Sequence, residues 1–206
     1  MANTTWHIGV ATGLVVGLAA TVPAFGAEPE IPAIRILVHA VTTIPPDRLV
    51  RAQAEATRIY AAVGVRLVWT DPLPTLPRIT MMIVSNPDDL PTVVGADALG
   101  VAPAADEGVG RLAYAYYVRI VASADQHSID VAKLLGYVIA HELGHILLAR
   151  GSHSSAGVMS GRWGQFEMDL VADDLLRFTN EQAKLIRNSV AAMNADHKRQ
   201  SGIVVK

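Results

Sequence analysis

The chain has 206 residues, of which 51% are hydrophobic and 17% are charged, and its formal net charge is −2. This composition is typical of one globular domain with a sizeable core, and a charge so near neutral gives no reason to expect nucleic acid as a partner. The sequence contains no cysteine, which excludes disulfides and leaves His, Asp and Glu as the side chains for a metal site.

The first 26 residues differ from the rest of the chain in composition. Residues 8–25 carry no charge and are rich in Val, Leu, Ala and Gly, and small residues occupy positions 24 and 26. This pattern is typical of an export signal that is cleaved before Ala27, and an uncleaved membrane anchor is the alternative. We expect a secreted or periplasmic protein without stable membrane association, organised as a signal peptide (1–26), a folded domain (27–195) and a flexible tail (196–206).

The first half of the folded domain is predicted to combine several strands with one helix. Residues 34–41 are apolar and β-branched, which predicts a buried strand. Pro45-Pro46-Asp47 then opens a helix that ends near Gly64, because proline is tolerated in the first helical turn and glycine favours a stop. Four further strands follow: 65–70, 78–85, a short edge strand at 98–103 and a longer strand at 111–122.

The second half is predicted to be mainly helical. The central helix covers residues 130–150, with Ser128 as its candidate N-cap and an apolar stripe along one side. Thr179 and Gln182 match the capping-box pattern and open a last helix that ends near residue 195. The expected fold is α+β: a mixed, mostly parallel twisted sheet of four to five strands, with two long helices packed on it and a C-terminal helix.

The segment HELGHILLARGSHSSAGVM, residues 141–159, contains three of the seven histidines of the chain. His141 and His145 are four residues apart on the predicted helix, so their side chains point the same way and can bind one zinc ion through ring nitrogens. Glu142 is offset by about 100° around the helix axis, from where it can reach a metal-bound water without ligating the metal. This H-E-x-x-H pattern predicts two ligands and a general base for a zinc-activated water.

A catalytic zinc needs a third protein ligand. His153 is the nearest candidate, because Gly151 can take the left-handed conformation that ends the helix and turns the chain back toward the metal. The alternative is an acidic residue further on: Glu167 follows His145 by 22 residues, and three aspartates lie nearby. We expect this acidic cluster to form a solvated face or to cap a short helix instead.

With these residues, the segment resembles the metzincin zinc peptidases, and most closely their matrixin-like members, in which a His-Ser pair precedes a methionine turn. The resemblance implies that the ligands are His141, His145 and His153, that Glu142 is the base and that Met159 lies beneath the zinc. It also implies a metzincin-like fold, and the predicted order of elements matches that fold. Seven residues separate the second and third histidines here, where the family has five. The helix is therefore expected to run one turn further, about 4.5 Å, before reversing.

The sequence therefore predicts an exported, monomeric zinc metalloendopeptidase that hydrolyses peptide or protein substrates. Two alternatives remain open: a non-catalytic secreted module whose histidines hold a structural zinc, and a thermolysin-like (gluzincin-type) hydrolase with Glu167 as third ligand. If residues 98–103 form an exposed edge strand, its backbone can pair with an extended peptide. Tyr114, Tyr116 and Tyr117 are expected to pack in the core rather than to stabilise an oxyanion.

Overall fold

Most of the predicted strands and helices are present, and a helix over Tyr117–His127 occurs that was not predicted. The computed structural model describes residues 30–69, 78–86, 95, 97–103, 111–148, 152–200 and 202. The predicted signal peptide lies outside these residues. In chain order the elements are β1 (Ala33–Ala40), α1 (Pro46–Ala61), β2 (Arg66–Val68), β3 (Arg78–Val84), β4 (Gly100–Val101), β5 (Leu112–Tyr116), α2 (Tyr117–His127), α3 (Val131–Leu148), α4 (Gln165–Ala172) and α5 (Asn180–Gln200).

The strands form one sheet in the order β2-β1-β3-β5-β4. β1 pairs in parallel with β2 and with β3, and β3 pairs in parallel with β5. β4 runs antiparallel to β5 and is an edge strand of the described sheet. The prediction of an α+β fold with a mixed, mostly parallel sheet is confirmed. α1 connects the parallel neighbours β1 and β2, which is the crossover that parallel pairing requires.

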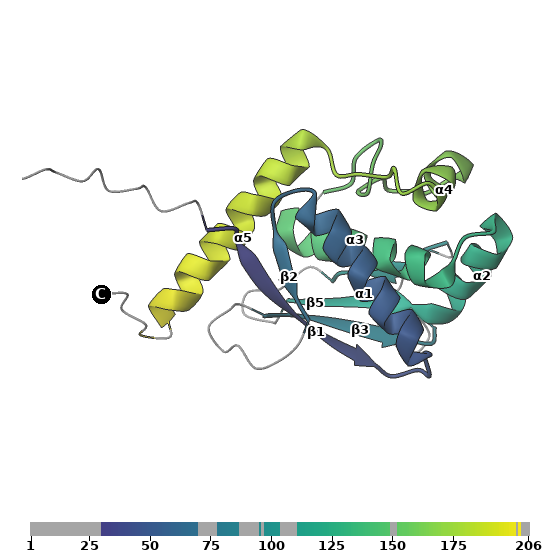
Figure 1. The fold of residues 1–206 in the computed structure, drawn as a ribbon, viewed down its shortest axis with the longest axis horizontal. Coiled ribbons are helices and arrows are strands. Elements are labelled where there is room, and N and C mark those ends of the chain that lie inside the picture. Colours follow the sequence, from purple (N-terminus) through teal and green to yellow (C-terminus); the bar gives the residue numbers. More distant parts are fainter. Residues whose placement is uncertain are drawn as a thin grey trace, which may run out of the picture. The chain divides into compact units, whose positions relative to one another are not determined.

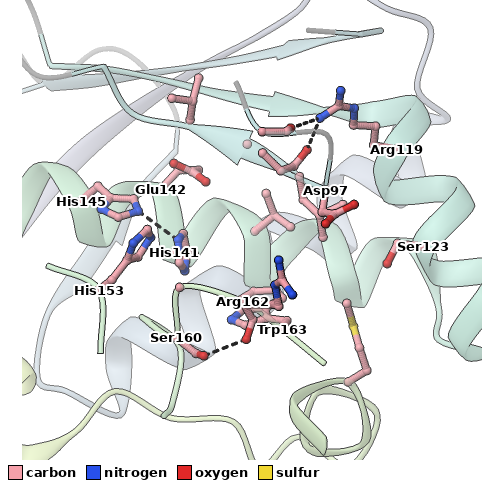
Figure 2. A pocket seen from close by; sticks show the side chains of 18 of the residues that line it. Asp97, Arg119, Ser123, His141, Glu142, His145, His153, Ser160, Arg162 and Trp163 are labelled. Atoms are coloured by element: carbon pink, nitrogen blue, oxygen red, sulfur yellow. Dashed lines mark hydrogen bonds between the residues drawn. The ribbon is translucent and has the colours of Figure 1, made fainter. Parts of the chain in front are cut away.

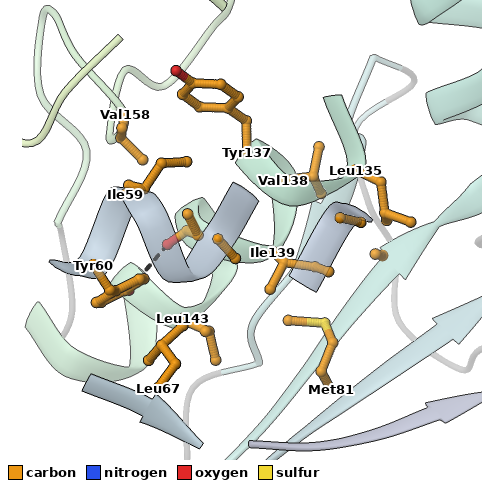
Figure 3. Packing of buried hydrophobic residues seen from close by; sticks show 14 of the residues in the cluster. Ile59, Tyr60, Leu67, Met81, Leu135, Tyr137, Val138, Ile139, Leu143 and Val158 are labelled. Carbon is orange, nitrogen blue, oxygen red and sulfur yellow. Dashed lines mark hydrogen bonds between the residues drawn. The ribbon is translucent and has the colours of Figure 1, made fainter. Parts of the chain in front are cut away.

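The hydrophobic core lies between one face of the sheet and the helices α1 and α3 (Figure 1). Alternate residues of β1, β3 and β5 point to this face, as the period of two in a strand dictates. Figure 3 shows Met81 of β3 facing Ile139 and Leu143 of α3. The fully buried Tyr60 of α1 donates its hydroxyl proton to the Ala140 carbonyl oxygen of α3 at 3.1 Å. This buried polar group is therefore satisfied, and it ties the two helices together.

Helix α3 carries His141, Glu142 and His145, and most residues of this helix are buried. Among the described residues it is the one helix long and apolar enough to cross a membrane by length and composition. However, 67% of that stretch is buried inside the protein, and Leu134, Leu135 and Ile139 are fully buried in the core. The apolar character of α3 is therefore explained by its packing between the sheet, α1 and α2.

The predicted strand over residues 111–122 is wrong in its second half. β5 ends at Tyr116 and α2 begins at Tyr117. The run is apolar throughout, and over so short a stretch strand alternation and helical spacing cannot be told apart. In the structure Tyr117, Ile120 and Ala124 bury one face of a helix. The period of two therefore describes only the first half of this segment.

The prediction that Ser128 is the N-cap of the central helix is also wrong. Ser128 instead ends α2, in the left-handed conformation with φ 55°. The carboxylate of Asp130 caps α3 by accepting a hydrogen bond from the Lys133 backbone N–H at 3.0 Å. Ser and Asp are both good N-caps. Only three residues separate α2 from α3, and because Ser128 ends α2, Asp130 is the residue that caps α3.

The C-terminal part begins as predicted and extends further. Thr179 and Gln182 form the reciprocal capping box, with Thr179 Oγ1 accepting at 3.2 Å and Gln182 Oε1 accepting at 2.9 Å. α5 continues to Gln200 rather than ending near residue 195, so the first residues of the predicted tail are helical. Its last turn carries His197, Lys198 and Arg199, and positive charge there is favourable to the helix dipole.

Candidate metal centre

His141 and His145 lie on successive turns of α3 and face the same side, as the H-E-x-x-H spacing predicts. Their Nε2 atoms are 3.0 Å apart. Two nitrogens that each lie 2.0–2.1 Å from a tetrahedral ion are about 3.3 Å apart. A small adjustment of the rings would therefore place both nitrogens on one ion.

His153 joins these two residues, although it lies beyond the end of the helix. Its ring centroid is 4.7 Å from that of His145 and 5.5 Å from that of His141, and Figure 2 shows the three rings gathered at one end of a cavity. One ring nitrogen from each histidine lies within 4.8 Å of the others, close enough to bind a metal ion. Gly151, which was predicted to turn the chain, lies outside the described residues. The ring of His153 nevertheless lies beside those of His141 and His145, as predicted.

Hydrogen bonds at the outer nitrogens orient both helical rings. His141 Nδ1 donates to the Val158 carbonyl oxygen at 2.6 Å, and His145 Nδ1 lies 2.7 Å from Ser152 Oγ. A carbonyl oxygen only accepts, so the proton of neutral His141 is on Nδ1 and the lone pair of Nε2 points toward the other histidines. Such an outer hydrogen bond is usual for histidines that bind metals, because it fixes the tautomer and the ring orientation.

Burial keeps these two rings neutral. It lowers the pKa of His141 to about 4, against a weaker opposing effect of the hydrogen bond to Val158. Burial also lowers the pKa of His145 to about 4, and the neighbouring His141 and His153 add to this shift. The Nε2 atom of neutral His141 carries a lone pair and lies 3.0 Å from His145 Nε2. When the proton of His145 is on Nδ1, directed to Ser152, both Nε2 atoms offer lone pairs that one cation could accept. The donor set therefore fits a metal ion.

Glu142 is a buried carboxyl group beside the three histidines. Only 3% of its surface is exposed, and its Oε2 atom accepts no hydrogen bond from the described residues. Burial raises the pKa of Glu142 to about 8. Buried polar atoms without a partner are rare and call for an explanation. A strongly perturbed carboxyl group in a cavity is the usual signature of a functional site.

The edge strand β4 passes directly over Glu142 because it carries a glycine there. A Cβ atom at Gly100 would lie 2.7 Å from Glu142 Oε1 and 2.6 Å from the Tyr114 carbonyl oxygen. A larger residue at this position would displace either the strand or the carboxylate. The predicted edge strand at 98–103 is thus confirmed, as the two-residue strand β4, and it forms one wall of the cavity.

Met159 lies beneath the turn of α3 that carries the two histidines. Its side chain is fully buried, and a Cβ atom at Gly144 would overlap the Met159 sulfur. The loop that carries it is closed by a hydrogen bond from Ser154 N–H to the Met159 carbonyl oxygen at 2.8 Å. The same loop supplies the Val158 carbonyl to His141. Met159 is therefore packed against the helix backbone at Gly144, between the positions of His141 and His145 in the chain.

The histidines and Glu142 open onto a cavity of about 910 Å³. Its walls come from the segment before and along β4, from α2, from α3, from residues 160–163 and from Met168 of α4. None of the three tyrosines weighed from the sequence is among the described residues that line it. Tyr117 accepts a hydrogen bond from Arg48 at 2.6 Å and Tyr116 is fully buried, so these two pack as expected.

Glu167, the alternative third ligand, lies outside the histidine group. Its Oε2 atom accepts a hydrogen bond from the Gly164 backbone N–H at 2.9 Å, at the N-terminus of α4. It does not line the cavity. The expectation that the acidic cluster caps a short helix is met by this residue, and the carboxylate stabilises the positive end of the helix dipole.

Sequence reasoning missed three contacts that shape the centre. Ser152 supports His145, and the Val158 carbonyl supports His141. The ring of Trp163 lies 5.5 Å from that of His141, edge to face at 88°. The sequence weakly indicated the Ser152 contact, because Ser152 is next to the predicted ligand His153. The contacts of Val158 and Trp163 with His141 depend on how the loop folds back, which the sequence does not indicate.

Comparisons with known proteins add no relative to this description: no family model matches the chain, and no curated protein matches it. A function for this protein therefore has to be inferred from the chemistry of the site itself.

Proposed function

We propose that this protein is a zinc-dependent peptidase with a metzincin-like fold, exported by its N-terminal segment and active as a monomer. The observation that supports this most directly is one arrangement at one end of a cavity. Three histidine nitrogens converge there, and the buried carboxyl group of Glu142 lies beside them. This is the constellation that metal-assisted hydrolysis needs: a ligand set, a proton acceptor and room for a substrate.

Zinc is the ion that this donor set favours. Three imidazoles without a thiolate are a common ligand set of catalytic zinc sites, which keep a fourth position open. The carbonyl bonded to His141 Nδ1 is the outer partner usual for such ligands. When bound, zinc would act as a Lewis acid that polarises a carbonyl group and makes water a better nucleophile at neutral pH.

Glu142 would handle the proton in this reaction. Its Oε2 atom has no donor among the described residues and lies in the cavity wall beside the histidines. We assign it the role of taking a proton from the attacking water and passing it to the leaving amine. Because Gly100 has no side chain, the backbone of β4 can lie close to the Glu142 carboxylate. Both would therefore face the same bound substrate.

A peptide is the substrate that the cavity wall favours. β4 pairs on one side with β5, and no described strand pairs with its other side. A free strand edge offers backbone hydrogen bonds to an extended chain. We therefore propose that a peptide lies along β4, with its scissile carbonyl at the histidine end of the cavity.

Both rival functions are less well supported by the geometry. A structural zinc site is expected to be closed by a fourth protein ligand, whereas the histidine group has three members among the described residues and opens onto the cavity. The gluzincin-type site needs Glu167 beside the histidines, and Glu167 instead caps α4. Neither alternative has an observation in its favour.

Metal content and hydrolysis together test the proposal. The purified protein should bind about one zinc ion and cleave a mixed pool of peptides. His153→Ala should lose zinc under conditions where Glu167→Ala keeps it. Zinc retained by His153→Ala but lost by Glu167→Ala would replace the proposed ligand set. Stoichiometric zinc without cleavage of any peptide would favour the non-catalytic module.

A further inference from the structure

One arginine in the cavity wall has no partner within the described part of the protein. The side chain of Arg162 lines the cavity, and it donates no hydrogen bond to, and forms no ion pair with, any described residue. Figure 2 shows its guanidinium group directed into the cavity. A guanidinium group has five N–H donors in a rigid plane. The donors of Arg162 are thus available to something that enters the cavity.

The backbone of Arg162 is held beside the metal centre. Ser160 Oγ donates to the Arg162 carbonyl oxygen at 2.8 Å. The preceding residue, Gly161, lies against the His153 ring, since a Cβ atom at this position would be 3.3 Å from His153 Nδ1. The following residue, Trp163, contacts the His141 ring. Arg162 therefore lies between two residues that each touch a candidate ligand, and its charge is presented close to the proposed point of cleavage.

Two other basic side chains of the cavity wall, Arg119 and His127, already have partners. Arg119 donates to the carbonyl oxygens of Gly95 and Ala98 at 2.8 and 2.9 Å. The ring of His127 is 3.1 Å from Gln165 Oε1. Among the described lining residues, Arg162 is therefore the arginine that remains free to recognise a ligand.

Asp97 carries the opposing charge in this cavity. It comes from the segment before β4, on the side that Arg119 anchors, and forms no ion pair with a described residue. Asp97 and Arg162 thus belong to different segments of the cavity wall, and Arg162 is the one whose chain neighbours, Gly161 and Trp163, contact the histidines. An anionic group near the histidines would meet Arg162, whereas one near Asp97 would be repelled.

We propose that Arg162 makes this site selective for substrates that carry a carboxylate close to the scissile bond. The inference rests on the proposed peptidase function. A guanidinium group binds a carboxylate through two parallel hydrogen bonds, which gives geometric selectivity as well as attraction. The carboxylate can be the side chain of Asp or Glu or the C-terminus of the peptide, and both present the same planar group to Arg162.

Matched peptides measure this preference. We would compare peptides that differ only by Asp against Asn, or Glu against Gln, at each position around the cleaved bond, and peptides with free against amidated C-termini. In the zinc-loaded wild-type protein, kcat/KM should be about 10- to 100-fold higher for the carboxylate member of a pair. A preference confined to free C-termini identifies the terminal carboxylate as the group that is bound, and one confined to Asp and Glu identifies the side chain.

Three variants assign the preference to Arg162. Arg162→Gln should bring the ratio close to one, and Arg162→Glu should reverse it in favour of Lys-containing peptides. Asp97→Asn, which removes a charge from the same cavity, should keep or increase the preference for carboxylates. Since Arg162 has no side-chain partner among the described residues, these variants should fold and bind zinc as the wild type does, which zinc content and thermal unfolding will verify.

A binding measurement separates this inference from the proposed function. Fluorescence anisotropy of a labelled carboxylate peptide is measured on Glu142→Gln with Arg162 present or replaced by Gln. Weaker binding without Arg162, with amidated or Asn peptides unaffected, supports the inference even if no variant cleaves peptides. Equal cleavage of acidic and neutral peptides by the wild type, or a preference that survives Arg162→Gln, overturns it and leaves the peptidase assignment standing.

Discussion

Two clusters of polar side chains adjoin α3, and they differ in whether their groups are paired. The first cluster joins α1, α3 and the residues after α4. Arg58 donates to Glu55 at 3.1 Å, to the Tyr137 hydroxyl at 3.0 Å and to Asp174 at 3.3 Å. Lys133 donates to the other oxygen of Asp174 at 3.1 Å. The charges of this cluster all have opposite partners within the fold, so the fold itself explains why they are there.

The candidate metal centre is the second cluster, and some of its polar groups have no partner among the described residues. The Nε2 atoms of His141 and His145 face each other, and Glu142 Oε2 has no donor among the described residues. Such an arrangement lowers stability unless something binds there. The comparison shows how two kinds of polar cluster can be told apart. Where the polar groups pair with one another, the cluster stabilises the fold; where they are left unpaired, the cluster is a candidate to bind a ligand.

The largest expected effect comes from Glu142→Gln. Removing the proton acceptor should lower kcat/KM by about 10²- to 10⁴-fold, while the three histidines keep the zinc. Burial raises the pKa of Glu142 to about 8, which destabilises the folded state near neutral pH, and an amide has no such cost. Thermal stability should therefore stay the same or rise slightly. Full activity in this variant would eliminate Glu142 as the base, and loss of zinc would indicate that its carboxylate is a ligand.

Among the expected effects on stability, metal removal should have the largest, and it should still leave the fold intact. The core between the sheet and α1 and α3 does not involve the histidines. At zinc about 100 times above its Kd, chelation should lower Tm by about 5–10 °C. Far-UV circular dichroism at 25 °C should not change. Unfolding of the metal-free protein at this temperature would point to a structural zinc instead.

Gly144→Ala should have a smaller effect on stability, and it should also weaken zinc binding. The new methyl group would overlap the Met159 sulfur, and such overpacking costs about 1–3 kcal/mol. Unfolding by denaturant measures this loss, and zinc affinity should fall with it because the histidines flank residue 144. Asn188→Ala, on the exposed side of α5, is the control and should change stability by less than about 0.5 kcal/mol.

The smallest effect is expected in the paired cluster. Arg58→Gln removes contacts to Glu55 and Asp174 that are partly exposed, and should lower the free energy of unfolding by about 1 kcal/mol. Zinc content and hydrolysis should not change. Arg51→Gln breaks a more exposed pair with Asp130 and should cost less. A loss of zinc on Arg58→Gln would mean that the two clusters are coupled through Tyr137 and Trp163, whose rings contact each other.

Local patterns predicted much of this architecture. The spacing of His141 and His145 on an apolar helix and the capping box at Thr179 depend on neighbours within four residues, and both are present. The ends of β1 and β3 were predicted to within one residue, because each is a short apolar run with polar or proline-containing flanks. The segment 111–122 failed because its apolar residues satisfy two periods equally well.

The remaining features could not be predicted because they join residues far apart in the chain. The paired cluster links Arg58 to Tyr137 and to Asp174 across the fold. The free guanidinium of Arg162 is distinguished from that of Arg119 only by the carbonyl oxygens that Arg119 happens to meet. A sequence lists both arginines alike, and their partners decide which one is available to a ligand.

The loop that orients His141 is itself fastened to a later part of the chain. Val158 accepts from His141 through its carbonyl oxygen, and its own N–H donates to the Arg177 carbonyl oxygen at 2.9 Å, just before α5. In the order of synthesis, all three histidines precede Arg177, so this hydrogen bond can form only after the candidate ligands have been made. A chain that ends before Arg177 would therefore keep all three histidines but lose this attachment of the loop that orients His141.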